Sequence, residues 1–301
     1  MIEVENLSKN YGAARVVSEV SFQVEKGEIV GFLGPNGAGK TTAMRILCGF
    51  LSPSGGTARV AGFDILKNSL EVRRSLGYLP ENAPLYQEMS VRDYLNYVAV
   101  LRGVPKSQRG VRLEAALDAG NLEARADSLI RQLSKGLQQR VGIAQAIIHD
   151  PPVLILDEPS SGLDPRQRAE TRAFIKSLAP EHTILLSTHI LPDVQETCSR
   201  VVVIHQGKVV GQEPVEGGAG ALTLILARPG VDASEKLARV AGVASVSRDK
   251  NGAFLLDLEA GADARESVAT LAVEQGWGVL EMAPRGADLE ARFLKLTTRE
   301  E

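Results

Sequence analysis

Short apolar runs alternate with amphipathic stretches through much of the chain. Ile29–Leu33 and Val153–Leu156 are continuous apolar runs, a pattern typical of parallel strands buried on both faces. Helical periodicity predicts helices over Pro165–Leu178 and Leu191–Cys198, with a strand at 183–187 between them. Strands that alternate with helices predict an α/β fold, in which a parallel sheet is covered on both faces.

From about residue 82 to residue 148 the pattern becomes helical without intervening strands. Val91, Leu95 and Val98 fall on one helical face, and a later helical run stops before Asp150-Pro151, because proline cannot continue a helix. We therefore expect a helical subdomain within the α/β domain.

A composition break predicts a linker at residues 213–220, where the sequence is Glu-Pro-Val-Glu-Gly-Gly-Ala-Gly. Beyond it the pattern predicts strand, helix, strand, strand, helix, strand, the order of ferredoxin-like folds. An amphipathic segment follows at Leu289–Leu296. The expected organisation is a large domain at 1–212 and a small α+β accessory domain at 221–301.

A glycine-rich stretch between a predicted strand and a predicted helix carries the clearest chemistry. Residues 34–42 match G-x-x-x-x-G-K-[ST], whose backbone N–H groups converge on one anion and whose glycines let the backbone approach it. An ordinary glycine-rich turn would not need eight ordered positions in this context. The stretch predicts binding of a nucleoside triphosphate, with Lys40 at the β- and γ-phosphates and Thr41 on Mg²⁺. The expected nucleotide contacts are Asn36, Gly37, Gly39, Lys40, Thr41 and Thr42.

Composition limits the other possibilities. Hydrophobic residues make up 44% and charged residues 24% of the 301 residues, which is ordinary for a globular protein. The net charge of −3 gives no electrostatic reason to expect nucleic acid. Cys48 and Cys198 lack a metal-ligand spacing, so buried free thiols in a reducing cytosol are expected. We expect neither a signal peptide nor a membrane span, so any membrane role requires a partner.

The stretch 133–140, Leu-Ser-Lys-Gly-Leu-Gln-Gln-Arg, resembles the signature motif of ATP-binding cassette (ABC) ATPases, L-S-x-G-x-x-Q-R. The other landmarks of that family appear in its order. They are an aromatic residue (Tyr11), the phosphate loop, a carboxylate pair after an apolar strand (Asp157, Glu158), a D-loop (161–164) and a switch histidine (His189). The resemblance covers residues 1 to about 212 and implies a P-loop NTPase fold that binds ATP and Mg²⁺.

The resemblance also implies roles that suit the chemistry of each residue. Asp157 would hold Mg²⁺ together with Thr41, Glu158 would be the general base, and His189 would contact the γ-phosphate. Two carboxylates after four buried residues are costly without a cation, which disfavours a mere strand cap. Tyr11 would stack on adenine, although a tyrosine that closes a hairpin explains that residue equally well.

In the family, the signature residues serve a nucleotide held by a second copy. Ser134 and Gly136 would therefore contact the partner's γ-phosphate in a head-to-tail dimer with two shared sites. Lys135 and Leu137 depart from the usual glycine and glutamine of the signature. Glu81 stands where the lid loop usually carries glutamine, and its carboxylate could hold Mg²⁺ or a water.

Three stretches resemble ATPases that pair with ABC-2-type permeases in gliding motility, drug resistance and sodium efflux. They are 78–81, 133–136 and 289–297. This likeness implies an export ATPase on the inner face of the cell membrane, docked through residues 82–132 to a separate permease. A soluble cassette ATPase acting on ribosomes or nucleic acid is the alternative, but the chain shows neither a long coiled coil nor a second cassette. A nucleotide kinase would have no use for the signature or for His189.

Overall fold

The structure is a computed structural model that describes residues 1–179, 181–215, 221–249, 252–259 and 262–284. The chain divides into two compact units, Met1–Glu213 and Pro214–Glu301. Each unit has its own sheet and its own apolar core, so each is described by itself.

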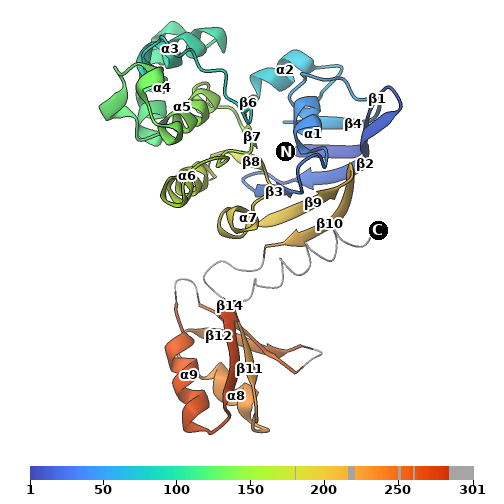
Figure 1. The fold of residues 1–301 in the computed structure, drawn as a ribbon, viewed down its shortest axis with the longest axis vertical. Coiled ribbons are helices and arrows are strands. Elements are labelled where there is room, and N and C mark those ends of the chain that lie inside the picture. Colours follow the sequence, from blue (N-terminus) through green and yellow to red (C-terminus); the bar gives the residue numbers. More distant parts are fainter. Residues whose placement is uncertain (180, 216–220, 250–251, 260–261, 285–301) are drawn as a thin grey trace. The chain divides into compact units, whose positions relative to one another are not determined.

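A six-stranded sheet lies at the centre of unit 1 (Figure 1). Its strands are β3 (Ile29–Leu33), β6 (Leu76–Leu79), β7 (Val153–Asp157), β8 (Thr183–Thr188), β9 (Arg200–His205) and β10 (Lys208–Pro214). They lie in the order β10-β9-β3-β8-β7-β6, and the pairs from β9 to β6 are parallel. Every residue of β3, β7 and β8 is buried. The predicted α/β architecture is confirmed.

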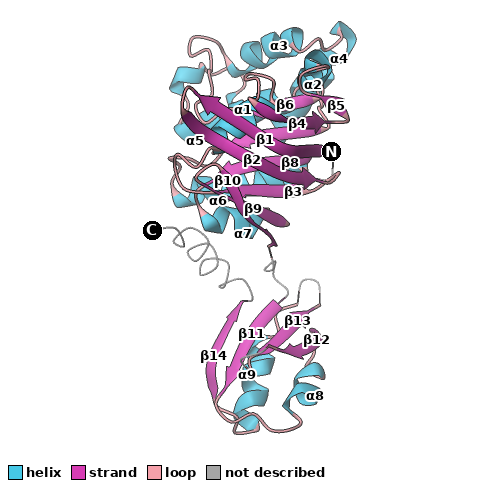
Figure 2. Ribbon diagram, turned by 90° about the vertical axis from the view of Figure 1, so that its right-hand side faces the viewer, coloured by secondary structure: helices cyan, strands magenta, loops and turns pink. Residues whose placement is uncertain are grey.

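A second sheet covers one face of the central sheet (Figure 2). Its strands are β1 (Ile2–Tyr11), β2 (Ala14–Val24), β4 (Gly55–Val60) and β5 (Phe63–Asp64), in the antiparallel order β2-β1-β4-β5. The sequence pattern did not predict that these strands form a sheet of their own. The two-residue connections from β1 to β2 and from β4 to β5 are too short for parallel pairing, which keeps these strands out of the parallel sheet.

Alternating residues of β3 show which elements cover each face. The helices of unit 1 that flank its sheets are α1 (Lys40–Leu47), α2 (Ser69–Arg74), α6 (Pro165–Leu178) and α7 (Leu191–Thr197). Gly31 lies against α7, where an added Cβ would come within 3.1 Å of Val194. The next residue, Phe32, points the other way, and its ring centroid lies 5.4 Å from that of Phe22 in β2. The sheet is therefore covered by α7 on one face and by the antiparallel sheet on the other.

The predicted helical subdomain is confirmed, and its first helix begins at Val91. Its helices are α3 (Val91–Leu101), α4 (Lys106–Ala119) and α5 (Lys135–Ile147), with short 3₁₀ turns at Glu123–Arg125 and Ile130–Gln132. They share a core that includes Leu95 and Leu117. α5 also touches the central sheet, since a Cβ on Gly77 of β6 would lie 2.2 Å from the carbonyl oxygen of Ala146. Glycine at position 77 therefore lets the helices approach the sheet.

Unit 2 has the predicted ferredoxin-like order. Its elements are β11 (Ala221–Leu226), α8 (Ala233–Ala238), β12 (Val243–Arg248), β13 (Phe254–Leu258), α9 (Arg265–Glu274) and β14 (Val279–Pro284). The sheet order is β12-β13-β11-β14, and all pairs are antiparallel. Phe254, Leu224 and Trp277 are buried in its core. The predicted amphipathic segment Leu289–Leu296 lies outside the described residues.

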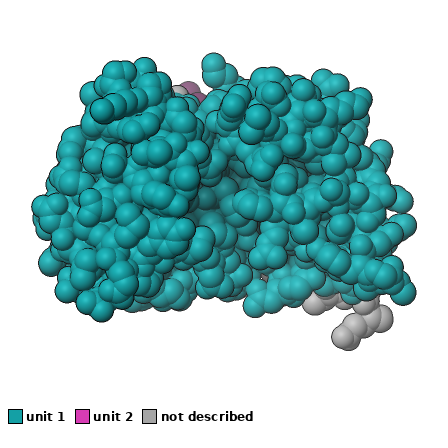
Figure 3. All heavy atoms as spheres, turned by 90° about the horizontal axis from the view of Figure 1, so that it is seen from above, with its two compact units in different colours: residues 1–213 teal, residues 214–301 magenta. Residues whose placement is uncertain are grey.

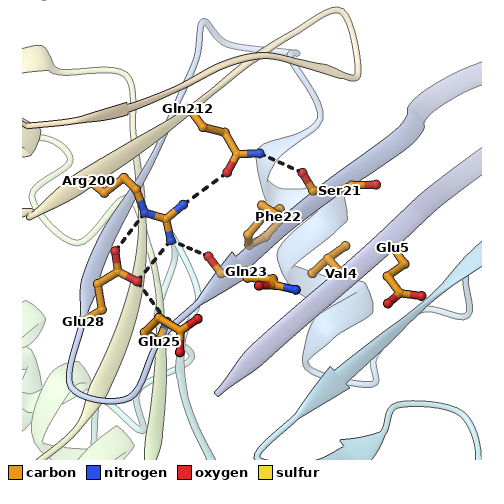
Figure 4. Close-up of a pocket in the computed structure, with 9 residues that line it drawn as sticks. All are labelled: Val4, Glu5, Ser21, Phe22, Gln23, Glu25, Glu28, Arg200 and Gln212. Atoms are coloured by element: carbon orange, nitrogen blue, oxygen red, sulfur yellow. Dashed lines mark hydrogen bonds and ion pairs between the residues drawn. The ribbon is translucent and has the colours of Figure 1, made fainter.

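Side-chain contacts hold the last strand of unit 1 in place. Arg200 of β9 donates to Glu28 at 2.9 Å and to the Gln212 side chain at 3.2 Å, and Gln212 donates to the carbonyl oxygen of Ser21 at 3.1 Å (Figure 4). Arg200, Glu28, Gln212 and Ser21 are among the residues that line a pocket of about 570 Å³. The Arg200 guanidinium already donates its hydrogen bonds to residues of the pocket wall. β10 thus continues to Pro214, two residues into the predicted linker. Among the described residues, no helix is long and apolar enough to cross a membrane.

These contacts predict where unit 1 can be cut. A chain that ends after Val215 keeps β10 and its Gln212 contacts, so we expect it to fold with one cooperative thermal transition. A chain that ends after Gly211 loses both hydrogen bonds of Gln212, each worth about 0.5–1.5 kcal/mol, and should melt at a lower temperature. Circular dichroism melts of both and of the full chain test this. Aggregation of the chain that ends after Val215 would contradict the expectation that unit 1 folds without unit 2.

Candidate nucleotide-binding site

Three glycines shape the turn between β3 and α1. A Cβ on Gly34 would lie 2.3 Å from the carbonyl oxygen of Ile204, and one on Gly39 would lie 2.7 Å from that of Val16. Gly39 has a φ of 102° and immediately precedes α1. Gly37 has a φ of 81°, and a Cβ there would meet no atom within 4 Å. The turn is backed by protein on one side and open on the other, as a phosphate cradle must be.

Lys40 begins α1 and is buried under this cradle. Its side chain is 6% exposed, and its Nζ donates to the carbonyl oxygens of Gly34 at 2.8 Å and Pro35 at 3.2 Å. The same nitrogen lies 3.3 Å from Oε1 of Glu158. The ammonium group therefore joins the cradle to the carboxylate at the end of β7.

The carboxyl end of β7 places Asp157 beside α1. Asp157 is fully buried, and its Oδ1 accepts hydrogen bonds from the Ser187 hydroxyl at 2.6 Å and the Thr41 hydroxyl at 3.3 Å. Its Oδ2 has no hydrogen-bond partner among the described residues. Burial raises the pKa of Asp157 in spite of the two hydrogen bonds. A buried carboxylate oxygen without a partner, next to a threonine hydroxyl, fits Mg²⁺, which prefers oxygen ligands.

Glu158 follows Asp157 and points toward His189. Its Oε2 lies 2.9 Å from Nδ1 of His189, whose side chain is 41% exposed. Glu158 is 6% exposed and has a φ of 49°, a left-handed conformation that is strained for a residue with a side chain. Its N–H donates to the carbonyl and hydroxyl oxygens of Ser187. The surrounding contacts therefore hold a strained residue with its carboxylate between a lysine and a histidine.

Sequence reasoning gave no role to Ser187, which organises this edge. Its hydroxyl contacts both Asp157 and the backbone of Glu158, because Asp157 and Ser187 are paired in the register of β7 and β8. The sequence feature that could have pointed to Ser187 is the run Ser187-Thr188-His189 at the end of a predicted strand. Without the strand order, nothing in the sequence says that this strand is the neighbour of β7.

The other residues predicted to contact the nucleotide or its metal lie on several elements, and only Asn36 and Thr42 belong to residues 34–42. Asn36 is exposed at the turn, and Thr42 is half-buried in the first turn of α1. Tyr11 ends β1, is 48% exposed, and has the Nζ of Lys9 5.3 Å from its ring centroid. Glu81 is exposed shortly after the end of β6, the strand beside β7. Among the described residues, no hydrogen bond or ion pair joins Tyr11 or Glu81 to the cradle.

Ser134 and Gly136 lie elsewhere, at the amino end of α5. The Ser134 hydroxyl caps this helix by accepting the N–H of Leu137 at 3.3 Å. Gly136 lies against α6, where an added Cβ would be 2.8 Å from the amide oxygen of Gln167. Both line a pocket of about 440 Å³ that includes Asp164 but none of residues 34–42. Viewed from above, unit 1 is hollowed between α3–α5 and the side that carries α1 and α2 (Figure 3).

A different set of possible metal ligands lies at the opposite edge of the sheet. Ligand atoms of Asp150, Glu181 and His182 fall within 4.8 Å of one another, where β7 and β8 begin. Asp150 is already paired with Arg112 at 2.8 Å, and His182 Nδ1 lies 2.6 Å from the carbonyl oxygen of Pro151. These residues take no part in the nucleotide site.

A glycine-rich turn with a buried lysine at the start of α1, and a buried carboxylate two strands away in the sheet, are typical of a P-loop nucleoside triphosphatase. The family model described as "ABC transporter" matches residues 17–161. The chain belongs to the ATP-binding subunits of ABC transporters, a family of ATPases that act with a membrane permease.

Relatives of known name support this assignment. The chain is 33% identical over 302 residues to the Nod factor export ATP-binding protein I of Cupriavidus metallidurans, a match that covers 100% of this chain and 98% of the relative. It is 37% identical over 218 residues to the bacitracin transport ATP-binding protein BcrA of Bacillus licheniformis, covering 72% and 70%. A solved structure of an ATP binding subunit of an ABC transporter aligns with a TM-score of 0.65 and 33% identity, over 72% of this chain and 90% of that one. The relatives give no support to the ribosomal alternative.

The environment of Asp157 predicts how the protein responds to Mg²⁺. Because burial raises its pKa in the folded protein, the charged form destabilises the metal-free fold above that pKa. Asp157→Asn removes this charge, so the metal-free protein should melt at the same or a higher temperature at pH 7. With ATP bound, the further rise in melting temperature that Mg²⁺ causes in the unchanged protein should be lost.

Thermal melts with ATP plus either EDTA or Mg²⁺ measure both effects. Asp118→Asn, an exposed change on α4, is the control and should keep the Mg²⁺ effect. In the unchanged protein this effect should weaken at acidic pH as Asp157 takes up a proton. Undiminished Mg²⁺ stabilisation in Asp157→Asn would remove Asp157 from the metal site.

Proposed function

We propose that the chain hydrolyses ATP in the cradle before α1 with Glu158 as general base, and that hydrolysis drives export. The observation that carries this proposal is the position of the Glu158 carboxylate. One oxygen lies 3.3 Å from Lys40 Nζ and the other 2.9 Å from His189 Nδ1. When Lys40 exchanges its present contacts for the β- and γ-phosphates, one oxygen of Glu158 becomes free to accept a proton from water. His189, more exposed than Glu158, would then contact the γ-phosphate.

Asp157 and Thr41 are the proposed holders of Mg²⁺. The metal, when bound, neutralises charge on the β- and γ-phosphate oxygens. Asp157 contributes Oδ2, the oxygen without a partner among the described residues, while Ser187 keeps the other oxygen in place. Glu81 follows the neighbouring strand β6 and is proposed to reach the metal or a bound water from the exposed side.

The signature residues are proposed to complete the site of a second copy. The carboxyl ends of β3 and β7 bring together the phosphate loop, Asp157 and Glu158, whereas Ser134 and Gly136 line a separate pocket on α5 and α6. This separation supports a head-to-tail dimer, in which α5 of one copy faces the nucleotide of the other. The amino end of α5 carries a partial positive charge, which favours a phosphate.

An ABC-2-type permease is the proposed membrane partner, and it would hold the protein on the cytoplasmic face of the membrane. The match to the Nod factor export protein extends over unit 2 as well as the cassette, which supports the export subgroup. The helical region also exposes aromatic and aliphatic side chains on α3 and just before it. Among them, Tyr86 is 51% exposed, Tyr97 is 38% exposed and Leu101 is 66% exposed. Such a surface suits a helix of the permease. Unit 2 is proposed to be an accessory packing or regulatory module.

Replacing the proposed base tests the mechanism directly. Glu158→Gln keeps the shape of the side chain but removes its capacity to accept a proton. We expect turnover to fall about 10²–10⁴-fold, while ATP binding persists and an ATP-bound dimer accumulates. Phosphate release and sedimentation with ATP measure these effects, and turnover like that of the unchanged protein would rule out Glu158 as the base.

Mixed dimers test whether the sites are shared. Gly136→Asp places a carboxylate where the partner's γ-phosphate is proposed to lie, and Lys40→Ala removes the cradle's charge. Each variant alone has two broken sites. In a mixed dimer of head-to-tail geometry, both lesions fall in one site and leave the other intact, so mixing should restore part of the turnover.

The control for size is Gly136→Asn, which lacks the charge and should impair ATP-driven dimerisation less. A mixture that is no more active than the sum of its parts would contradict the shared-site arrangement.

A further inference from the structure

A buried ionic network lies next to the proposed base, and among the described residues none of its hydrogen bonds or ion pairs reaches the cradle. The Ser160 hydroxyl donates to Oδ2 of Asp193, and Arg172 donates to the other oxygen, Oδ1, at 2.9 Å. Ser160 and Asp193 are 5% and 3% exposed. Arg172 also pairs with Glu196 at 2.8 Å, on the exposed side of the network.

The network joins the two chain segments that carry Glu158 and His189. Ser160 lies two residues after Glu158, and Asp193 lies four residues after His189, in the first turn of α7. These segments leave the paired parallel strands β7 and β8 at the same edge. The Glu158–His189 contact and the Ser160–Asp193 contact therefore form two successive cross-links between them.

We propose that Asp193 is a positioning residue, which aligns Glu158 and His189 by holding Ser160 and Arg172. Glu158 has a strained φ of 49°, and such a residue keeps its conformation only where several contacts fix it. Its N–H is fixed by Ser187 on one side, and Ser160 fixes the chain just beyond it. A buried ion pair rarely adds net stability over apolar packing, so stability alone does not account for this network. The inference rests on the proposed roles of Glu158 and His189.

Two variants change the second cross-link. Ser160→Ala removes the hydroxyl and leaves the Asp193–Arg172 ion pair in place, whereas Asp193→Asn keeps the shape of the side chain, removes its charge and leaves Arg172 paired with Glu196 alone. We expect each to lower kcat about tenfold while KM for ATP changes less than twofold, as for the loss of alignment in the transition state. Glu196→Gln breaks only the exposed arm of the network and is the matched control, with kcat unchanged.

A double-mutant cycle separates alignment from general destabilisation. In a His189→Ala background, Ser160→Ala should lower the single-turnover rate less than twofold, because the contact to be aligned is gone. Equal losses in both backgrounds would show a merely structural role and overturn the proposal, as would unchanged kcat in Ser160→Ala. If Asp193→Asn does not fold, Ser160→Ala still decides.

The Glu158→Gln variant distinguishes this inference from the proposed function. Normal turnover in Glu158→Gln would refute the assigned base. If Glu158→Gln is inactive but Ser160→Ala keeps its kcat, only the positioning role of Asp193 fails.

Discussion

Two adjacent carboxylates at the end of one buried strand are the constraint on which the site depends. Asp157 is fully buried and Glu158 nearly so, and a buried charge is stable only with partners. The partners come from elements far apart in sequence: Lys40 and Thr41 from α1, and Ser187 and His189 from the end of β8. The strand order β3-β8-β7 brings these elements to one edge. The order of the parallel strands thus supplies the partners that these buried charges need.

The ion pair between Lys40 and Glu158 compensates the charges of both buried side chains. Lys40 balances Glu158 in the structure, although the proposed mechanism needs that lysine at the phosphates. A nucleotide would therefore change the partners of Lys40 and Glu158 together, which links phosphate binding to the readiness of the base. Burial raises the pKa of Asp157. Its Oδ2 has no partner among the described residues, so a bound cation would stabilise the charged form.

Elements defined by local pattern could be predicted from the sequence, and contacts between distant elements could not. The helix Pro165–Leu178 has the predicted bounds, because its periodicity and flanking residues are local. The ferredoxin-like order of unit 2 followed from the same kind of pattern. The separate sheet of β1, β2 and β4 was missed, since pairing depends on partners that the pattern does not name. Ser187 and Asp193 were missed for that reason, because a serine or an aspartate acquires its role only from its neighbours in space.

The chain supplies both parts of the proposed catalytic site but does not bring them together. Residues of the cradle, β7 and β8 lie at the edge of the central sheet, whereas Ser134 and Gly136 lie on α5, in a pocket shared with Asp164. Asp164 caps α6 by accepting the N–H of Gln167, and the connection 158–164 leads from the proposed base to that cap. A partner that engaged this pocket would therefore act on the segment that Ser160 ties to Asp193. In the proposed dimer, the connection gives each copy a short structural path from the neighbour's nucleotide to its own Glu158.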